Sequence, residues 1–425
     1  MKKFFVLIMF LMLTVKSAES LPERYDLRDY GRITSVKNQG KLAACGTFAS
    51  LGAMESNYLT QGLGKATDLS EKHLVYYGYG HSGTMPEKSF TPTYSSETFA
   101  TVAFCARLAG PALEQNMKYS DKLKSVGRSA AKKLPEDYKR PMRLREAYFL
   151  SSYDPYDAID IDTRKKLIMK HGAIVVGYYS DIKKYHRTEN YYTYFNNSQR
   201  RTHEVLLAGW DDNFSRDNFN PKPKNNGAWL VKNSWGTDWG DKGYFWMSYE
   251  QMLYGGTAFI VEKDNPKLKH YGYDDLGYCN TLKCTWGANI FKIEGKSESL
   301  KEAAFYTTHN DTACEISVYD LGDSSPASPV SGKLISGVKY TAEFAGYHTV
   351  NLPEVIPMKE GQFFSIILNV NRGTIPVEAK RNRHSENAVA NKGESYFSEN
   401  GTSWEDGITI IGGSNACIKA FTITK

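Results

Sequence analysis

A glycine- and tryptophan-rich segment constrains the fold of this chain more than any other stretch. Residues 227–249 read GAWLVKNSWGTDWGDKGYFWMSY, an apolar strand, a loop that contains Asn233, and an aromatic strand. The segment holds four glycines together with Trp235 and Trp239, which is more than a tight turn requires. It therefore predicts two strands joined by a loop whose role goes beyond reversing the chain.

Cys45 lies at the predicted start of a helix. Apolar side chains recur after it at helical spacing, at Phe48, Leu51, Met54 and Tyr58. A helix N-terminus presents unpaired backbone N–H groups and the positive end of the helix dipole, and both lower the pKa of a thiol. Cys45 is therefore a candidate nucleophile, although a small buried cysteine at a helix start is the commoner case.

A second candidate opens the strand that precedes the glycine-rich segment. Residues 202–212, THEVLLAGWDD, form an apolar run that begins at His203. Alone, such a histidine is usually structural. Together, Cys45, His203 and Asn233 resemble the papain-like cysteine peptidases. The resemblance implies that His203 is the base for the thiol, that Asn233 orients the imidazole, and that Trp235 shields their hydrogen bond. Gln39, six residues before Cys45, would stabilise the oxyanion.

The resemblance covers about residues 21–262 and includes the stretches LPERYDLRDYGRITSVKNQG, LSEKHLVYYGYG and KHGAIVVGYY. It implies an α+β fold with two lobes, one helical and one an antiparallel β-barrel, followed by an all-β sandwich. The expected domains are a signal peptide at 1–18, a peptidase domain at 19–262, a linker at 263–270 and a lectin-like domain at 271–425.

The residues around Cys45 depart from the family pattern. Ala43 stands where relatives carry glycine, and Gly46 stands where they carry tryptophan. Leu42 replaces the cysteine that usually forms a disulfide in this place. Loss of the tryptophan removes a large buried side chain, which weakens packing if nothing fills the space. Since none of these changes deletes a catalytic group, we still expect a working nucleophile.

Three further positions bear on substrate binding. Ser95 and Ser96 occupy the place of a Gly-Gly pair that lets the substrate backbone approach closely in relatives. Glu204 follows His203, where relatives carry a small residue that lines the pocket for the side chain two positions before the cleaved bond. An acid there favours Arg or Lys in the substrate. The alternative is that Glu204 turns to solvent or pairs with Arg200 or Arg201.

The N-terminus predicts export. Lys2 and Lys3 precede an apolar run from Phe4 to Val15, with small residues suited to cleavage near Ala18. This run is shorter than the roughly 20 residues that span a membrane. We therefore expect a secreted, periplasmic or cell-surface protein with no stable membrane span. Few residues separate this cleavage point from LPERYD, so no long inhibitory prosegment is expected.

The net charge and the spacing of the cysteines indicate which ligands the chain is expected to bind. Removal of the signal, with its three lysines, lowers the formal charge from +6 to +3, which gives nucleic-acid binding no support. Cys279 and Cys284 are spaced as C-x4-C, but no second pair or histidine cluster accompanies them. A disulfide or free thiols are thus favoured over zinc. No metal and no cofactor are expected.

The last third of the chain changes character. Short alternating strands between Gly-, Asn- and Ser-rich turns predict a β-sandwich. The opening YGYDDLGY and the ending ACIKAFT resemble a lectin-like domain found after papain-like domains in bacterial and archaeal secreted proteins. Tyr271, Tyr273, Trp286 and Trp404 could stack on a sugar, although aromatic residues in a sandwich more often form its core.

The sequence therefore predicts a secreted cysteine endopeptidase that acts on proteins or peptides through an acyl-thioenzyme. The alternative is a catalytically weakened papain-like homologue that binds a protein or a glycan, with a cell-surface ligand on the lectin-like domain.

Overall fold

The computed structural model describes residues 20–78, 98–120, 138–150, 159–196, 198, 200–380, 385, 388–410 and 412–424. The predicted signal peptide and the two serines Ser95 and Ser96 lie outside these residues.

The four α-helices among the described residues all belong to the N-terminal part of the chain. They are α1 (Cys45–Thr60), α2 (Glu71–Gly78), α3 (Thr98–Ala106) and α4 (Ile161–His171). Fourteen of the sixteen residues of α1 are buried, so this helix is central and not a surface element. It contacts the strands β9 (Tyr254–Lys263), β6 (His203–Asp211) and β3 (Ile174–Tyr178).

The strands of the N-terminal part form a sheet, and α1, α3 and α4 pack against it. These strands are β1 (Arg24–Asp26), β2 (Met142–Phe149), β3 (Ile174–Tyr178), β4 (Tyr185–Arg187), β5 (Tyr192–Tyr194), β6 (His203–Asp211), β7 (Ala228–Lys232), β8 (Tyr244–Ser248) and β9 (Tyr254–Lys263). Neighbouring pairs are antiparallel except for β5 and β8, which are parallel. The apolar run that begins at His203 and the two strands around Asn233 form β6, β7 and β8, as the sequence predicts.

In the C-terminal part, the described residues form strands, turns and one short 3-10 helix, Gly407–Thr409. Its strands are β10 (Leu268–Tyr271), β11 (Asn280–Leu282), β12 (Trp286–Lys292), β13 (Glu298–Thr307), β14 (Thr312–Gly322), β15 (Lys333–Ala342), β16 (Gly346–Met358), β17 (Phe363–Val370), β18 (Ile375–Ala379), β19 (Ser395–Ser398), β20 (Glu405–Asp406), β21 (Ser414–Ala416) and β22 (Ile418–Thr424). A six-stranded sheet, β15-β14-β17-β12-β19-β20, packs on β13, β16 and β22 around one apolar core. This is a two-layer sandwich.

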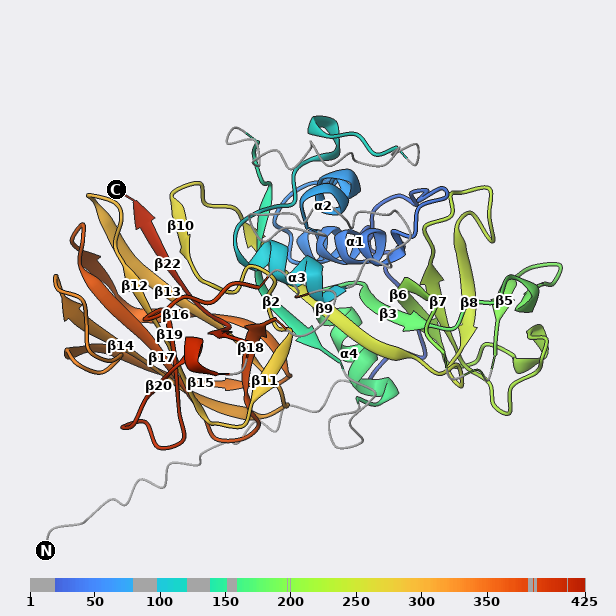
Figure 1. Cartoon of the computed structure of the whole chain (residues 1–425). Coiled ribbons are helices and arrows are strands. Elements are labelled where there is room, and N and C mark those ends of the chain that lie inside the picture. The colour runs from blue at the N-terminus through green and yellow to red at the C-terminus, as the bar shows by residue number, and fades with distance from the viewer. Residues whose placement is uncertain are drawn as a thin grey trace, which may run out of the picture.

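One sheet runs through both parts of the molecule. Its order is β10-β22-β13-β16-β2-β9-β3-β6-β7-β8-β5-β4, with β1 attached to β6 (Figure 1). The two parts meet where β16 pairs with β2, in the register Gly346 with Tyr148 and His348 with Glu146. A Cβ on Gly346 would lie 1.9 Å from the carbonyl oxygen of Ala147, so this junction requires glycine. Backbone hydrogen bonds therefore join the two parts directly.

A buried ion pair lies beside this junction. Arg143 of β2 donates two hydrogen bonds to the carboxylate of Glu302 on β13, at 2.8 and 2.9 Å. Both side chains are at most 1% exposed. Arg145 lies 3.1 Å from the same carboxylate. Bidentate geometry offsets part of the cost of taking two charges out of water, and each charge depends on the other.

We expect Arg143→Met to lower the free energy of unfolding by about 3 to 5 kcal/mol, because it leaves the Glu302 carboxylate buried with weaker compensation. The double variant Arg143→Met/Glu302→Leu should recover much of that loss. Urea unfolding measures both. The control is Lys339→Met, which removes an ion pair with Glu315 in which Lys339 is 86% exposed and should cost less than about 1 kcal/mol. A loss at Arg143 no larger than this control would contradict the assigned role.

Candidate active site

His203 and Asn233 are brought together by the pairing of β6 with β7. His203 is the first residue of β6, and Asn233 directly follows β7. The ring atom Nε2 of His203 lies 2.8 Å from Oδ1 of Asn233. The backbone N–H of Ser234 donates to the same Oδ1, also at 2.8 Å. Because Oδ1 accepts from that amide, Nε2 carries the hydrogen and Nδ1 is left with the lone pair that a base needs.

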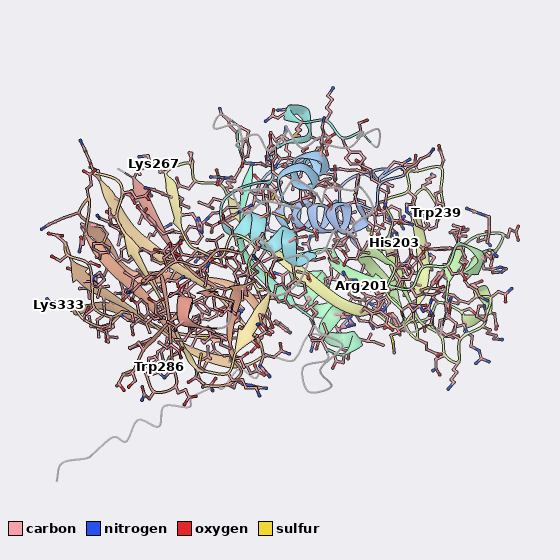
Figure 2. The ribbon with its side chains drawn as sticks, viewed as in Figure 1. Arg201, His203, Trp239, Lys267, Trp286 and Lys333 are labelled. Carbon is pink, nitrogen blue, oxygen red and sulfur yellow. The ribbon has the colours of Figure 1, made fainter. Side chains whose placement is uncertain are left out.

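Trp235 covers this hydrogen bond. Its ring stacks on the imidazole of His203, with centroids 4.8 Å apart and an interplanar angle of 27°. His203 is 6% exposed and Asn233 is 3% exposed. Burial lowers the pKa of His203 to about 4, and the hydrogen bond that the ring donates to Asn233 opposes this only in part. The imidazole is therefore neutral above about pH 4. Figure 2 shows where His203 lies in the N-terminal part of the molecule.

Cys45 is the first residue of α1, as predicted, and its side chain lies next to the start of β6. Backbone hydrogen bonds from Glu204 and Gly46 reach its thiol. The first turn of α1 lies entirely within the described residues and contains no acidic side chain. No such negative charge therefore offsets the effect of the positive end of the helix dipole on the thiol. Even so, burial raises the pKa of the Cys45 thiol, and the carboxylate of Glu204 raises it further. The expected lowering of the thiol pKa was thus wrong for the resting site, because burial outweighs the helix terminus.

Gln39 is fixed by the loop that follows Asn233. Its backbone N–H donates to the carbonyl of Ser234 at 2.8 Å, and its Oε1 accepts from the Ser234 hydroxyl at 2.6 Å. Its Nε2 donates to the carbonyl of Leu42 at 2.8 Å. Tyr119 donates from its hydroxyl to the Gln39 carbonyl, also at 2.8 Å. The amide has two hydrogens and this arrangement uses one of them, so the other can serve a ligand.

Glu204 is buried and already paired. It is 5% exposed, and its Oε1 forms an ion pair with Arg201. Its Oε2 accepts from the hydroxyl of Thr98 at 3.2 Å. In the structure, Glu204 therefore pairs with Arg201. The neighbouring Arg200 is exposed.

Leu42, which stands where relatives carry a disulfide cysteine, has an apolar role instead. It forms a small buried cluster with Ala44, Phe48 and Val75, and Tyr119 packs against it. The rings of Phe48 and Tyr119 meet edge to face at 4.9 Å. Side-chain packing thus anchors the loop before Cys45 where relatives use a covalent bond.

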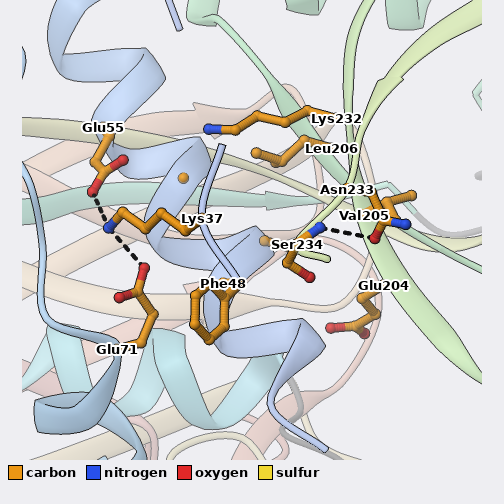
Figure 3. Close-up of a pocket in the computed structure, with 12 residues that line it drawn as sticks. Lys37, Phe48, Glu55, Glu71, Glu204, Val205, Leu206, Lys232, Asn233 and Ser234 are labelled. Carbon is orange, nitrogen blue, oxygen red and sulfur yellow. Dashed lines mark hydrogen bonds and ion pairs between the residues drawn. The ribbon is translucent and has the colours of Figure 1, made fainter. Parts of the chain in front are cut away.

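A buried charge cluster beneath the Gln39 loop was not predicted. Lys37 Nζ lies 3.0 Å from Glu55 Oε1 and 2.7 Å from Glu71 Oε1 (Figure 3). Glu55 also accepts from the backbone N–H of Leu69 at 2.8 Å and from the hydroxyl of Thr34. The available signal was Glu55 itself, an acid among the apolar positions of α1.

The fourth charged group of this cluster is Lys232, which directly precedes Asn233. Its Nζ donates to the carbonyl of Thr34 at 2.9 Å. Burial lowers the pKa of Lys232 to about 8 and raises the pKa of Glu71 to about 8. The cluster thus connects α1, α2 and the two loops that carry Gln39 and Asn233.

All six cysteines are free thiols, and Cys105, Cys314 and Cys417 are fully buried. Within the described residues, no group of three or more His, Cys, Asp or Glu side chains is arranged to hold a metal ion.

We expect Glu55→Gln to lower the free energy of unfolding by about 2 to 4 kcal/mol, because it removes a fully buried charge that Lys37, Leu69 and Thr34 share. The matched control is Asp68→Asn. Asp68 pairs with the same Lys37 at 2.7 Å but is 64% exposed, so its loss should cost less than about 1 kcal/mol. Urea unfolding measures the free energy of unfolding of both variants. Equal losses would show that the buried Glu55 contributes no more to stability than the exposed Asp68.

Comparison with known proteins agrees with this geometry. The model of the papain family of cysteine proteases matches residues 21–259, and the model of the lectin-like domain matches residues 270–422. A structure of the clostridial cysteine protease Cwp84 after propeptide cleavage is 26% identical, with a TM-score of 0.80 over 95% of this chain and 99% of that one. A second structure holds the cysteine protease and lectin-like domains of Cwp84, described as a surface layer associated protein of Clostridium difficile. It is 26% identical, with a TM-score of 0.78 over 95% of this chain and 89% of that one.

Curated relatives match the N-terminal part. A cathepsin L-like protein of Caenorhabditis elegans is 27% identical over 246 residues, which are 56% of this chain and 62% of the relative. A cysteine protease of Blomia tropicalis is 27% identical over 254 residues, 57% of this chain and 66% of the relative. The match thus spans less than two thirds of either relative. These findings confirm the predicted papain-like fold followed by a β-rich, lectin-like domain. The chain belongs to the papain family of cysteine proteases.

Proposed function

We propose that this protein is a secreted cysteine endopeptidase that hydrolyses peptide bonds through an acyl-thioenzyme. The observation that carries the proposal is the 2.8 Å contact between His203 and Asn233, together with the Cys45 thiol, which accepts a backbone hydrogen bond from Glu204, the residue after His203, at the N-terminus of a buried helix. A nucleophile, a base and a group that orients the base are the parts this chemistry needs.

In the proposed reaction, Nδ1 of His203 takes the proton from the thiol of Cys45, and the thiolate attacks the carbonyl carbon of the substrate. The backbone N–H of Cys45 and the free amide hydrogen of Gln39 donate to the oxyanion. The C–N bond then breaks, and His203 gives its proton to the leaving amine. Water, with His203 as the base, hydrolyses the thioester and restores the thiol.

The electrostatics suit this sequence of steps. A thiol with a raised pKa and an imidazole with a lowered pKa are both neutral at pH 7. Proton transfer creates two opposite charges side by side, each of which stabilises the other in a site with little water. The helix N-terminus favours the thiolate, and the Oδ1 of Asn233 favours the imidazolium.

Substrate contacts are proposed for four residues. Glu204 follows His203 and Trp235 stacks on its ring, and the family resemblance suggests that both lie beside the bound peptide, with Glu204 near the side chain two positions before the cleaved bond. Ser95 and Ser96, which lie outside the described residues, are proposed from the family resemblance to bind the substrate backbone. The substrate class is protein or peptide.

Export and a surface ligand complete the proposal. The apolar N-terminal run supports a signal peptide at residues 1–18, and the similarity to a surface layer associated protein supports a cell-surface location. No described helix has the length and apolarity needed to cross a membrane. We assign residues 19–262 to the peptidase domain, 263–270 to the linker and 271–425 to the lectin-like domain.

The lectin-like domain offers two of the four candidate aromatic residues to a glycan. Tyr271 and Tyr273 pack with the sandwich core, as the alternative interpretation predicts. Trp286 and Trp404 are partly exposed, and their rings meet edge to face at 6.5 Å. A glycan partner therefore rests on this pair of tryptophans.

The alternative function is binding of a protein or a glycan by a catalytically weakened homologue. One observation favours it: the pKa of the Cys45 thiol is raised, and the next residue is Gly46, where relatives have tryptophan.

The proposed roles predict a graded loss of peptide hydrolysis. Cys45→Ala and His203→Ala should each lower kcat/KM by at least about a thousandfold, because each removes a reacting group. Gln39→Ala should cost about a hundredfold, as expected for one oxyanion donor. The control is Cys105→Ala, which removes a buried thiol that the reaction does not use. Hydrolysis at the parent rate in either Cys45→Ala or His203→Ala would overturn the assignment.

A further inference from the structure

The side chain of Arg201 lies over a glycine of β3. It crosses β3 at Gly177, where an added Cβ would come 2.9 Å from Arg201 Cδ and 3.0 Å from its Nε. Gly177 is also the β3 partner of Glu204 in the β3–β6 register. The guanidinium therefore reaches the Glu204 carboxylate across a residue that has no side chain. Any larger residue at position 177 would take the space of the Arg201 stem.

This ion pair lies next to the nucleophile. The backbone of Glu204 hydrogen bonds to the thiol of Cys45, and its carboxylate accepts from Thr98 at the start of α3. Glu204 also lines a small cavity together with Phe48 and Asn233 (Figure 3). The Glu204 backbone bonds to the thiol and its carboxylate is near enough to act on the thiol electrostatically, so a group bound at the thiol lies close to this carboxylate.

The two partners differ in exposure. The side chain of Glu204 is 7% exposed, whereas that of Arg201 is 32% exposed. A buried carboxylate needs a cation, and Arg201 can leave toward solvent while the acid cannot. A tethered cation also competes at a high effective concentration, in the millimolar range for a short tether, against any cation that arrives with a ligand.

We propose that Arg201 occupies the place that a basic substrate side chain would take at Glu204, and so suppresses a preference for Arg or Lys there. The proposal rests on the proposed peptidase function. It makes Arg201 a specificity-determining residue and assigns Glu204 to a latent acidic subsite. The parent protein should then show little selectivity for basic side chains at the position that contacts Glu204.

Arg201 also affects the charge that the thiol experiences. Among the groups that act on Cys45, the Glu204 carboxylate raises the thiol pKa and the Arg201 guanidinium lowers it. Removal of Arg201 therefore strengthens the negative field at the thiol. A cationic thiol reagent should gain from this change relative to a neutral one, whether or not peptides are cleaved.

The first test is a positional peptide library on the parent, Arg201→Ala and Arg201→Gln. Gln keeps part of the stem over Gly177 while it removes the charge. Both variants should gain about ten- to a hundredfold in kcat/KM for Arg or Lys over Leu at the position facing Glu204, as expected for one charge-assisted contact. Arg200→Ala, the exposed neighbour, is the matched control and should leave the profile unchanged.

The double variant Arg201→Ala/Glu204→Gln should lose the gained preference, which identifies the carboxylate as its source. Two results would overturn the inference. One is an active Arg201→Ala with the parent profile at every position. The other is a parent that already prefers Arg or Lys strongly at the position facing Glu204. A parent that cleaves no peptide would instead refute the proposed function.

The second test does not need hydrolysis. It compares the rates at which 2-aminoethyl methanethiosulfonate and neutral methyl methanethiosulfonate modify Cys45, read by peptide mass spectrometry. Each reagent transfers its thioalkyl group to the thiolate and releases methanesulfinate. Arg201→Gln should raise the cationic-to-neutral rate ratio several-fold at Cys45 and leave it unchanged at Cys279. An unchanged ratio at Cys45 would show that Arg201 does not mask Glu204.

Discussion

The close contact between α1 and β6 is the constraint on which the candidate site depends. A Cβ on Gly52 would lie 2.8 Å from Cδ1 of Leu206, so the helix packs closely on the strand here, and a larger residue at position 52 would require the Leu206 side chain to move. The contact brings the first residue of the helix, Cys45, to the start of the strand, where His203 and Glu204 follow each other. Neither catalytic candidate is on a mobile connection, because each opens a regular element whose interior is buried.

The same strand order connects the site to the rest of the molecule. Strand β6 continues through β3 and β9 to β2, which pairs with β16 of the lectin-like part. One of the buried clusters also spans both parts, since it includes Tyr306, Tyr347 and Phe421 together with residues of α1 and β6. The lectin-like part is therefore packed against the protease part as one body. A ligand bound by the former would be carried in a fixed direction relative to the cleft.

Much of this arrangement could be predicted from the sequence, since short motifs identify local structure well. The helix start at Cys45 and the strands around Asn233 follow from apolar spacing and glycine content. Features that depend on packing could not be predicted. The raised thiol pKa reflects burial, and the pairing of β2 with β16 joins strands about two hundred residues apart. Similarly, the sequence alone left two interpretations of Glu204 open. The position of Gly177 beneath Arg201 shows why the ion pair forms.

The most direct measurement of the central claim is labelling of the native protein at pH 7 with an irreversible epoxide inhibitor of papain-like enzymes, followed by peptide mapping. All six cysteines are free, and Cys279 and Cys284 are more exposed than Cys45. Exposure alone would therefore direct a reagent to those two thiols. If the site is assembled for catalysis, one adduct forms, on Cys45, and His203→Ala abolishes it. Equal labelling of the exposed thiols, or an unmodified Cys45, would contradict the account.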